Sequence, residues 1–259
     1  MTTKIISSKL DALKVDLTNT LMPPVQRIAE MKAALGIEWS PEQGSVLLCD
    51  AREVLGAGGE RAGKSWVGAN YLNIRDAAWD GELYWIVGKD YDRCQKEFEY
   101  TAQAMLKLNV VQASEVHTPH SGQWYMKLIS GTVIKTWSLQ DWLKVGSEAP
   151  KGIVICEVAQ ISHTEYLRLT DRTAEKRGWV IGTGTFEGSL GWFPELWKLY
   201  QLPGQSGQSF SYPTWSNLAI FKGGYDDPEI QRLRDKYVDR LDYFMERFGG
   251  VPSPPKGLV

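Results

Sequence analysis

The sequence predicts an α/β fold with a mostly parallel β-sheet that is covered by helices on both faces. Short apolar runs typical of buried strands alternate along the chain with longer amphipathic stretches typical of helices. Such alternation favours parallel strands joined by helical crossovers. The chain has 259 residues, of which 43% are hydrophobic, and this is enough for a large domain with a substantial buried core.

The elements can be assigned in order along the chain. Leu10, Leu13 and Leu17 recur at helical spacing, and a second helical stripe closes at Gly36. After this N-terminal segment, strands are predicted at 46–49, 83–87, 125–129, 132–137, 153–156 and 179–181, and helices at 65–78 and 91–108. A loop is expected at 202–207, a charged amphipathic helical segment at 227–248 and a linker at 249–259.

Charge and cysteine content narrow the class of protein. The formal net charge is −2, so binding of a polyanion would need a local basic patch. The three cysteines, Cys49, Cys94 and Cys156, form no CxxC pair, which argues against a zinc site and a disulfide framework. The sequence contains no signal peptide and no apolar run of membrane-spanning length, so we expect a cytoplasmic protein.

A glycine-rich stretch carries the strongest local signal. Residues 58–65 satisfy the pattern G-x-x-x-x-G-K-[ST] and lie between an apolar run and a helical stretch, as in a phosphate-binding loop. In such a loop the main-chain amides face the phosphates, Lys64 neutralises the β/γ charge and Ser65 ligates Mg²⁺. The sequence therefore predicts a RecA-like P-loop NTPase fold. The predicted nucleotide-binding residues of the loop are Gly58, Gly59, Glu60, Arg61, Ala62, Gly63, Lys64 and Ser65.

An acid follows the most apolar of the predicted strands. Residues 152–156 form a buried-strand pattern, and Glu157 comes directly after it. Because the carboxyl ends of parallel strands meet at one edge of the sheet, we expect Glu157 to lie at a neighbouring strand's tip beside the P-loop. There it would orient the attacking water and contribute to the Mg²⁺ site. The alternative is an ordinary glutamate in solvent at a strand end.

From Trp39 onward the sequence resembles, motif by motif, the ATPase domain of tailed-phage large terminases. Residues 39–43 resemble the family's adenine-recognition motif, which makes Gln43 the candidate for binding the base. Residues 154–160 resemble its apolar strand followed by Asp-Glu-Ala-Ala, and 181–188 resemble its Gly-Thr-Pro coupling motif. The implied coupling residues are Thr183, Gly184 and Thr185. Further similar segments are 84–92, 192–196, 212–217 and 244–250.

The resemblance implies the motor domain of a viral DNA-packaging enzyme, with ATP and Mg²⁺ as ligands. Such a motor hydrolyses ATP to move duplex DNA into a procapsid, in the cytoplasm of the host cell during virion assembly. The implied partners are double-stranded DNA, the portal protein, the terminase small subunit and further copies of the chain. Those copies would form a pentameric ring on the portal, with a monomer in solution left open.

The resemblance also implies how the chain is divided. We assign N-terminal helices to 1–38, the P-loop ATPase core to 39–215, a C-terminal lid subdomain to 216–250 and the start of a linker to 251–259. In the family a nuclease domain follows this linker. It would begin after Val259, so we expect no nuclease activity in this chain.

Three positions depart from the family's pattern. Cys156 stands where the family has its Mg²⁺-associated aspartate, and a neutral thiol is a poor partner for Mg²⁺. Either Glu157 serves both metal and water, or hydrolysis is weakened, or the acid lies elsewhere. In the P-loop, Glu60 takes the place of the usual arginine and Arg61 comes one position later, while Gly184 replaces the usual proline of the coupling motif.

The source of an arginine or lysine finger remains open. Residues 143–146 are similar to the segment that carries the family's finger arginine, which makes Lys144 a candidate, although a solvated loop lysine is the alternative. A basic cluster could instead supply the finger or contact the DNA backbone. This cluster, called the 168–177 cluster below, comprises Arg168, Arg172, Lys176 and Arg177.

Two other functions compete with a packaging motor. A helicase-like P-loop motor would share the phosphate loop and the strand acid, but it would need a second RecA-like core, which is not found in the sequence. A nucleotide-gated binding module would fit if Cys156 marks a lost metal site.

Overall fold

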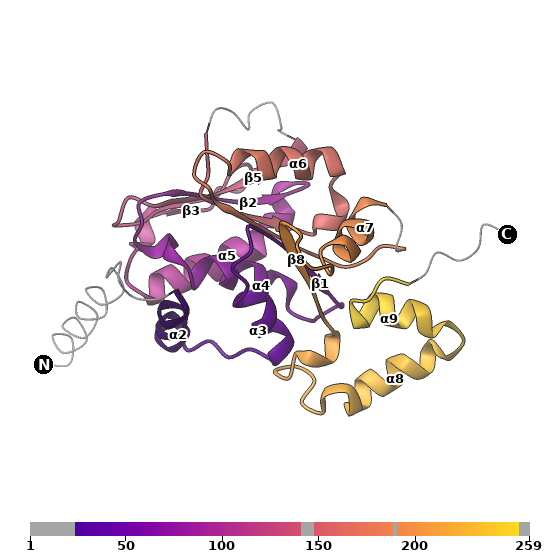
Figure 1. Cartoon of the computed structure of the whole chain (residues 1–259). Helices are drawn as coiled ribbons and strands as arrows, with labels where there is room; N and C mark the ends of the chain where they lie inside the picture. The colour runs from indigo at the N-terminus through magenta and orange to yellow at the C-terminus, as the bar shows by residue number, and fades with distance from the viewer. Residues whose placement is uncertain (1–23, 141–147, 189–190, 254–259) are drawn as a thin grey trace, which may run out of the picture.

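The computed structural model, which describes residues 24–140, 148–188 and 191–253, confirms the predicted α/β architecture (Figure 1). Eight strands of the described residues form one sheet in the order β3-β4-β5-β2-β6-β7-β1-β8. The strands from β5 to β8 in this order are parallel, and β3 and β4 join antiparallel at one edge. The strand bounds are β1 Glu53–Gly58, β2 Leu83–Gly88, β3 Val116–His117, β4 Tyr125–Lys127, β5 Val133–Ser138, β6 Gly152–Cys156, β7 Trp179–Gly184 and β8 Gly207–Tyr212.

Helices cover both faces of the sheet, with α2, α3, α4 and α5 on one side and α6 and α7 on the other (Figure 1). The α8 and α9 helices form a separate group beyond the β1 and β8 edge (Figure 1). The helix bounds are α2 Pro24–Leu35, α3 Pro41–Leu47, α4 Lys64–Asn73, α5 Tyr91–Lys107, α6 His163–Arg172, α7 Trp192–Leu199, α8 Pro228–Lys236 and α9 Leu241–Gly249. Within the described ranges, no helix combines the length and apolar character needed to cross a bilayer.

The side chains of the central strand β6 point alternately to the two faces of the sheet, and each face has its own hydrophobic core. Ile153 and Ile155 pack in the cluster that contains the α6 and α7 side chains. Val154 and Cys156 point the other way, into the cluster beneath α4 and α5. Because successive side chains of a strand point to opposite faces, this register directs the Cys156 thiol toward α5.

The prediction of a strand at 46–49 is wrong. Ser40 caps a helix, α3, that includes Val46 and Leu47, and its side chain and that of Gln43 complete a reciprocal capping box. The apolar residues Val46 and Leu47 therefore lie on the buried side of α3. The strand that leads into the P-loop is β1, and the edge strand β8 was also not predicted.

The C-terminal helical segment predicted at 227–248 is divided into α8 and α9 by a short 3₁₀ turn, Val238–Arg240. These helices share a small hydrophobic cluster of their own, formed by Phe221, Ile230, Phe244 and Phe248.

At the N-terminal end of the described residues, the helix predicted to close at Gly36 is confirmed as α2, and its Met31 lies in the main core. The first stripe, Leu10 to Leu17, lies outside the described residues.

Candidate functional site

The predicted P-loop connects the end of β1 to the start of α4. Gly63 caps α4 in a left-handed conformation with φ 89°, which favours glycine. Gly59 is required for space, because a Cβ there would lie 2.1 Å from the carbonyl oxygen of Phe248. The first amides of α4 have no partner inside the helix and carry its positive dipole end. The loop therefore has the geometry of an anion-binding site, as the sequence predicts.

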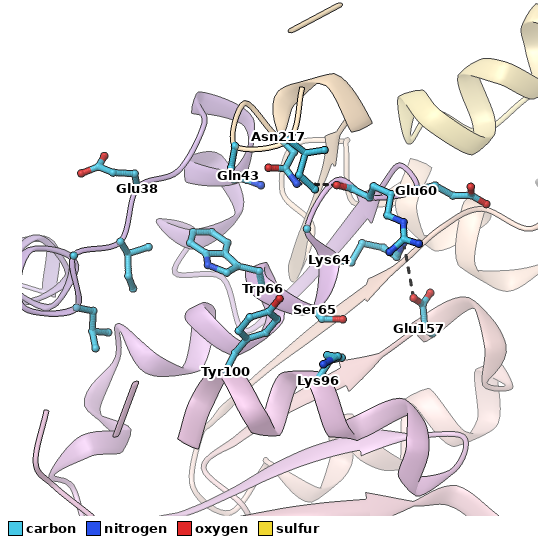
Figure 2. Close-up of a pocket in the computed structure, with 17 residues that line it drawn as sticks. Glu38, Gln43, Glu60, Lys64, Ser65, Trp66, Lys96, Tyr100, Glu157 and Asn217 are labelled. Atoms are coloured by element: carbon cyan, nitrogen blue, oxygen red, sulfur yellow. Dashed lines mark hydrogen bonds and ion pairs between the residues drawn. The ribbon is translucent and has the colours of Figure 1, made fainter. Parts of the chain in front are cut away.

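An open cavity of about 970 Å³ lies in front of this loop (Figure 2). Gly63, Lys64 and Ser65 line it on the loop side. The rest of the wall comes from the loop before α3, from α3, α4 and α5, and from the segment after β8. The residues include Ile37, Glu38, Gln43, Trp66, Tyr100, Asn217 and Ile220. A cavity of this size is typical of small-molecule sites, and its mixture of cationic, apolar and aromatic residues suits a nucleotide.

Lys64 and Glu157 face one another at one end of this cavity (Figure 2). The Lys64 ammonium lies 3.8 Å from a carboxylate oxygen of Glu157, and both side chains are partly exposed. Glu157 follows β6 and adopts φ 49°, a left-handed conformation that is uncommon outside glycine and concentrates at functional sites. The expectation that its strand is next to the P-loop strand is wrong, because β7 lies between β1 and β6. The predicted pairing of loop and acid is nevertheless present.

Gln43 lies against the P-loop. Its amide nitrogen donates to the carbonyl of Ala62 at 2.9 Å, and its amide oxygen accepts from the main-chain N–H of Ser40. The side chain is buried and lines the cavity. The structure thus brings the predicted base-binding residue to the nucleotide loop, where it also holds the loop in shape. Its contact with an adenine base stays a prediction.

A second acid, not predicted from the sequence, lies behind the loop. Glu97 of α5 is only 2% exposed, and its carboxyl group lies near the side chains of Ser65 and Cys156. Burial raises the pKa of Glu97 to about 7, and the negative charge of Glu157 raises it further, while the main-chain N–H of Glu97 and the nearby side chains of Ser65 and Cys156 lower it. Burial also raises the pKa of the Cys156 thiol, and its neighbours Cys94 and Glu97 add to this effect.

Replacing Glu97 by glutamine should make stability less sensitive to pH. The folded pKa of about 7 lies above the ordinary value of 4.5, so the folded state binds this proton more tightly than the unfolded state does. The stability from this group is complete below the unfolded value and is lost as the pH rises through 7. From pH 5 to pH 8, the free energy of unfolding of the parent should fall by about 2 kcal/mol relative to Glu97→Gln. Chemical denaturation of both proteins at both pH values measures this difference, and equal changes in the two would contradict it.

The predicted coupling residues separate into two environments. The Thr185 hydroxyl donates to the carbonyl of Gly58 at 3.0 Å, which ties the end of β7 to the start of the P-loop. Thr183 is buried beneath α4, with its hydroxyl oxygen 3.6 Å from where a Cβ of Gly68 would lie. Of the two hydroxyls, only that of Thr185 belongs to a residue lining a cavity next to Glu157. Gly184, where the family has proline, packs against Val158 and Ala159.

That second cavity, of about 450 Å³, shares Glu60, Lys64 and Glu157 with the first and extends toward α9. Two arginines that line it, Arg93 and Arg247, were not predicted. Arg93 is the third residue after the N-cap of α5, where the sequence gives no sign that the chain folds it toward Lys64. Both add positive charge near the predicted phosphate position.

The C-terminal helix α9 is bonded directly to the P-loop. Arg247 of α9 forms an ion pair with Glu60 at 2.6 Å, and the Glu60 N–H donates to the Arg247 carbonyl at 2.9 Å. Thr214 and Asn217, between β8 and α8, donate to the carbonyls of Glu60 and Arg61. Glu60, which replaces the arginine usual in the family, is therefore an anchor for α9. A change in the loop's position would be transmitted to this subdomain.

The finger candidates within the described residues do not lie at the P-loop. Lys144 is outside the described residues. The 168–177 cluster lies at the end of α6 and in the turn before β7 begins, and Lys176 there pairs with Glu82 just before β2. These positions are at the amino-terminal edge of the sheet, opposite the P-loop edge. A finger from this cluster would have to come from a neighbouring subunit.

Solved structures with a similar fold are those of phage large terminases. The ATPase domain of the Thermus phage P74-26 large terminase matches with a TM-score of 0.66 at 16% identity, covering 85% of this chain and 96% of that one. The large terminase of another thermophilic bacteriophage, in complex with ATP-gamma-S, gives 0.62 at 15% identity over 83% and 53% of the two chains. For the HK97 bacteriophage large terminase the values are 0.60, 12%, 84% and 50%.

These matches confirm the predicted resemblance at the level of the fold: the chain has the fold of a phage large terminase ATPase domain. It spans about half the length of the second and third of these enzymes. No protein-family profile and no curated protein matches the sequence.

Proposed function

We propose that this chain is the ATP-hydrolysing motor domain of a viral DNA-packaging enzyme. The observation that carries the proposal is the 3.8 Å approach of Lys64 and Glu157 at the mouth of a nucleotide-sized cavity. A lysine that binds phosphate and a carboxylate that orients water are the two groups that hydrolysis of a nucleoside triphosphate requires in a P-loop enzyme. One of the similar large terminases, from a thermophilic bacteriophage, was solved with ADP and with ATP-gamma-S, which supports the choice of nucleotide.

The residues present fit Mg²⁺ bound together with the nucleotide. No group of three or more His, Cys, Asp or Glu side chains in the described parts of the chain could hold a metal alone. Mg²⁺ in P-loop sites is held by substrate phosphates, a hydroxyl and one or two carboxylates, so this is the expected arrangement. Ser65 would provide the hydroxyl, and a carboxylate oxygen of Glu97 that has no hydrogen-bond partner among the described residues is buried nearby. The ion would supply neutralisation of the phosphate charge.

Each residue then has a distinct task. The loop amides and Lys64 bind the phosphates, and Gln43 and the apolar wall near Ile220 receive the base. Glu157 accepts a proton from the attacking water, or orients it, on the side of the cavity that faces Arg93. Loss of the γ-phosphate would shift the loop and with it Thr185 and the Glu60–Arg247 ion pair.

In this proposal the lid subdomain at 216–250 transmits the loop's movement to duplex DNA. The partners would be double-stranded DNA, the portal protein, the terminase small subunit and further copies in a ring, and the host cytoplasm would be the site of action. If the 168–177 cluster supplies the finger, it would do so from a neighbouring copy, because it lies at the edge of the sheet opposite its own P-loop. The second cavity, which opens beside Glu157, is where such a side chain would enter.

Phosphate release by the purified chain tests the proposal. With ATP and Mg²⁺ we expect turnover that increases when duplex DNA is added, since DNA is the load of the motor. ATP binding without turnover under both conditions would favour the nucleotide-gated binding module, for which the replacement of an acid by Cys156 is the specific argument. Absence of ATP binding would refute both functions.

A further inference from the structure

The substitution of Cys156 leaves the Mg²⁺ side of the site without its strand acid. Cys156 is at the end of β6, 1% exposed, and directed toward α5. A thiol is a soft ligand that suits zinc or copper rather than Mg²⁺, so this side chain cannot replace a carboxylate. If the chain hydrolyses ATP, another oxygen ligand or acceptor must serve the Ser65 hydroxyl and the ion.

Glu97 is the carboxylate that reaches this position. Ser65 and Gly68 are three residues apart and therefore lie on the same face of α4. A Cβ at Gly68 would lie 3.6 Å from Cγ of Glu97 and 3.1 Å from Cγ1 of Val154, so the stem of Glu97 runs between α4 and β6. From there its carboxyl group is close enough to the side chains of Ser65 and Cys156 for both to lower its pKa.

The contacts of Glu97 are incomplete without a further partner. One carboxylate oxygen is fully buried and accepts no hydrogen bond from the described part of the chain, although buried acceptors are nearly always satisfied. The sequence also places this acid among buried residues. The buried stripe of α5 includes Cys94, Phe98, Thr101 and Met105, and Glu97 lies within that stripe. A charged residue on the core side of an amphipathic helix is costly unless it is paired with an opposite charge.

We propose that Glu97 replaces the missing strand aspartate and positions Ser65 and a hydrated Mg²⁺ beside the nucleotide phosphates. In this arrangement the acceptor that P-loop enzymes place on the strand is supplied from the neighbouring helix α5. Glutamate is one methylene longer than aspartate, which suits a reach from the helix to the tip of the strand. Glu157 remains free to act on water. This inference rests on the proposed nucleotide site.

The test is the dependence of nucleotide affinity on Mg²⁺. Binding of fluorescent ADP is measured by titration in EDTA and in Mg²⁺ for the parent, for Glu97→Gln and for Glu99→Gln, a control on the exposed face of the same helix. We expect Glu97→Gln to reduce the gain in affinity caused by Mg²⁺ by roughly 10- to 100-fold while leaving affinity in EDTA unchanged. The control should match the parent in both conditions.

Rescue distinguishes a role in ion binding from a structural one. Adding Cys156→Asp to Glu97→Gln returns a carboxylate to the strand and should restore most of the gain in affinity, whereas a defect of packing would not be repaired. The inference would be overturned if the increase in nucleotide affinity caused by Mg²⁺ is unchanged in Glu97→Gln, or if the parent shows no such increase. If no nucleotide binds the parent in either condition, the proposed function itself fails.

A structure of the unmodified chain shows whether Glu97 positions Ser65 and the ion, even if Glu97→Gln does not fold. With ADP and Mn²⁺ bound, the anomalous signal of the metal locates the ion. Glu97 hydrogen-bonded to Ser65 or to water on that ion supports the proposal. A Glu97 side chain turned into the core away from both would overturn it.

Discussion

Replacing Lys64 by alanine should reduce ATP turnover by roughly 100- to 1000-fold or more, because a preorganised cation is lost from the phosphates. Lys64 is the first residue of α4 and lines both cavities, so its ammonium is held where the β- and γ-phosphates would lie. In the structure it pairs with the Glu157 carboxylate, 3.8 Å away. The variant leaves that carboxylate without this partner at the point where negative phosphates would enter.

Steady-state phosphate release with ATP, Mg²⁺ and duplex DNA measures the effect. Lys127→Ala is a matched control, because Lys127 is an exposed lysine on β4, near the far edge of the sheet, and the substitution removes the same charge. Circular dichroism establishes that both variants fold. Turnover in Lys64→Ala equal to that of the control would show that the loop does not bind the reacting phosphates, and the proposed function would have to be abandoned.

The P-loop and its acid could be predicted from the sequence because each depends on local pattern. The glycine spacing at 58–65 determines a loop shape by itself, and an apolar strand that ends in Glu157 places the acid at the same sheet edge. The order of strands could not be obtained in this way. That β7 separates β1 from β6 depends on crossover packing between distant segments, which leaves no local trace.

Glu97 was missed for a different reason. It lies in a stretch rich in charge, Tyr-Asp-Arg-Cys-Gln-Lys-Glu-Phe-Glu, where one more glutamate is inconspicuous. Helical spacing nevertheless contained a signal, since Cys94, Glu97, Phe98 and Thr101 share a face at i, i+3, i+4 and i+7. An acid within an apolar stripe, combined with the lack of an acid at Cys156, could have indicated a compensating pair.

Two errors in the predicted secondary structure also have specific causes. The run at 46–49 is apolar enough for a strand, but the capping box formed by Ser40 and Gln43 begins a helix at Pro41, five residues earlier. Strand β8 was not predicted because a glutamine and two serines interrupt the apolar pattern of Gly207–Tyr212. Within the described sheet it is an edge strand paired with β1 alone, so its residues need not be uniformly apolar.

Glu157→Gln should separate binding from chemistry. The amide keeps the size of the side chain but cannot accept the proton of water, so turnover should fall by roughly 100- to 10,000-fold, while ATP affinity should hold or increase because a negative charge beside the phosphates is removed. Fluorescent-nucleotide binding and single-turnover phosphate release, measured on the same preparation, follow the two effects. Glu175→Gln, an exposed glutamate in the turn before β7, is the control.

The outcome assigns the roles of the two acids. If Glu157 alone served both water and metal, Glu157→Gln would lose the affinity gained from Mg²⁺ together with turnover. Because Glu97 lies close enough to Ser65 for that side chain to lower its pKa, we expect the gain in affinity from Mg²⁺ to survive in Glu157→Gln and to be reduced only in Glu97→Gln. Undiminished turnover in Glu157→Gln would transfer the role of base to another carboxylate that lines the second cavity, Glu187 or Glu246.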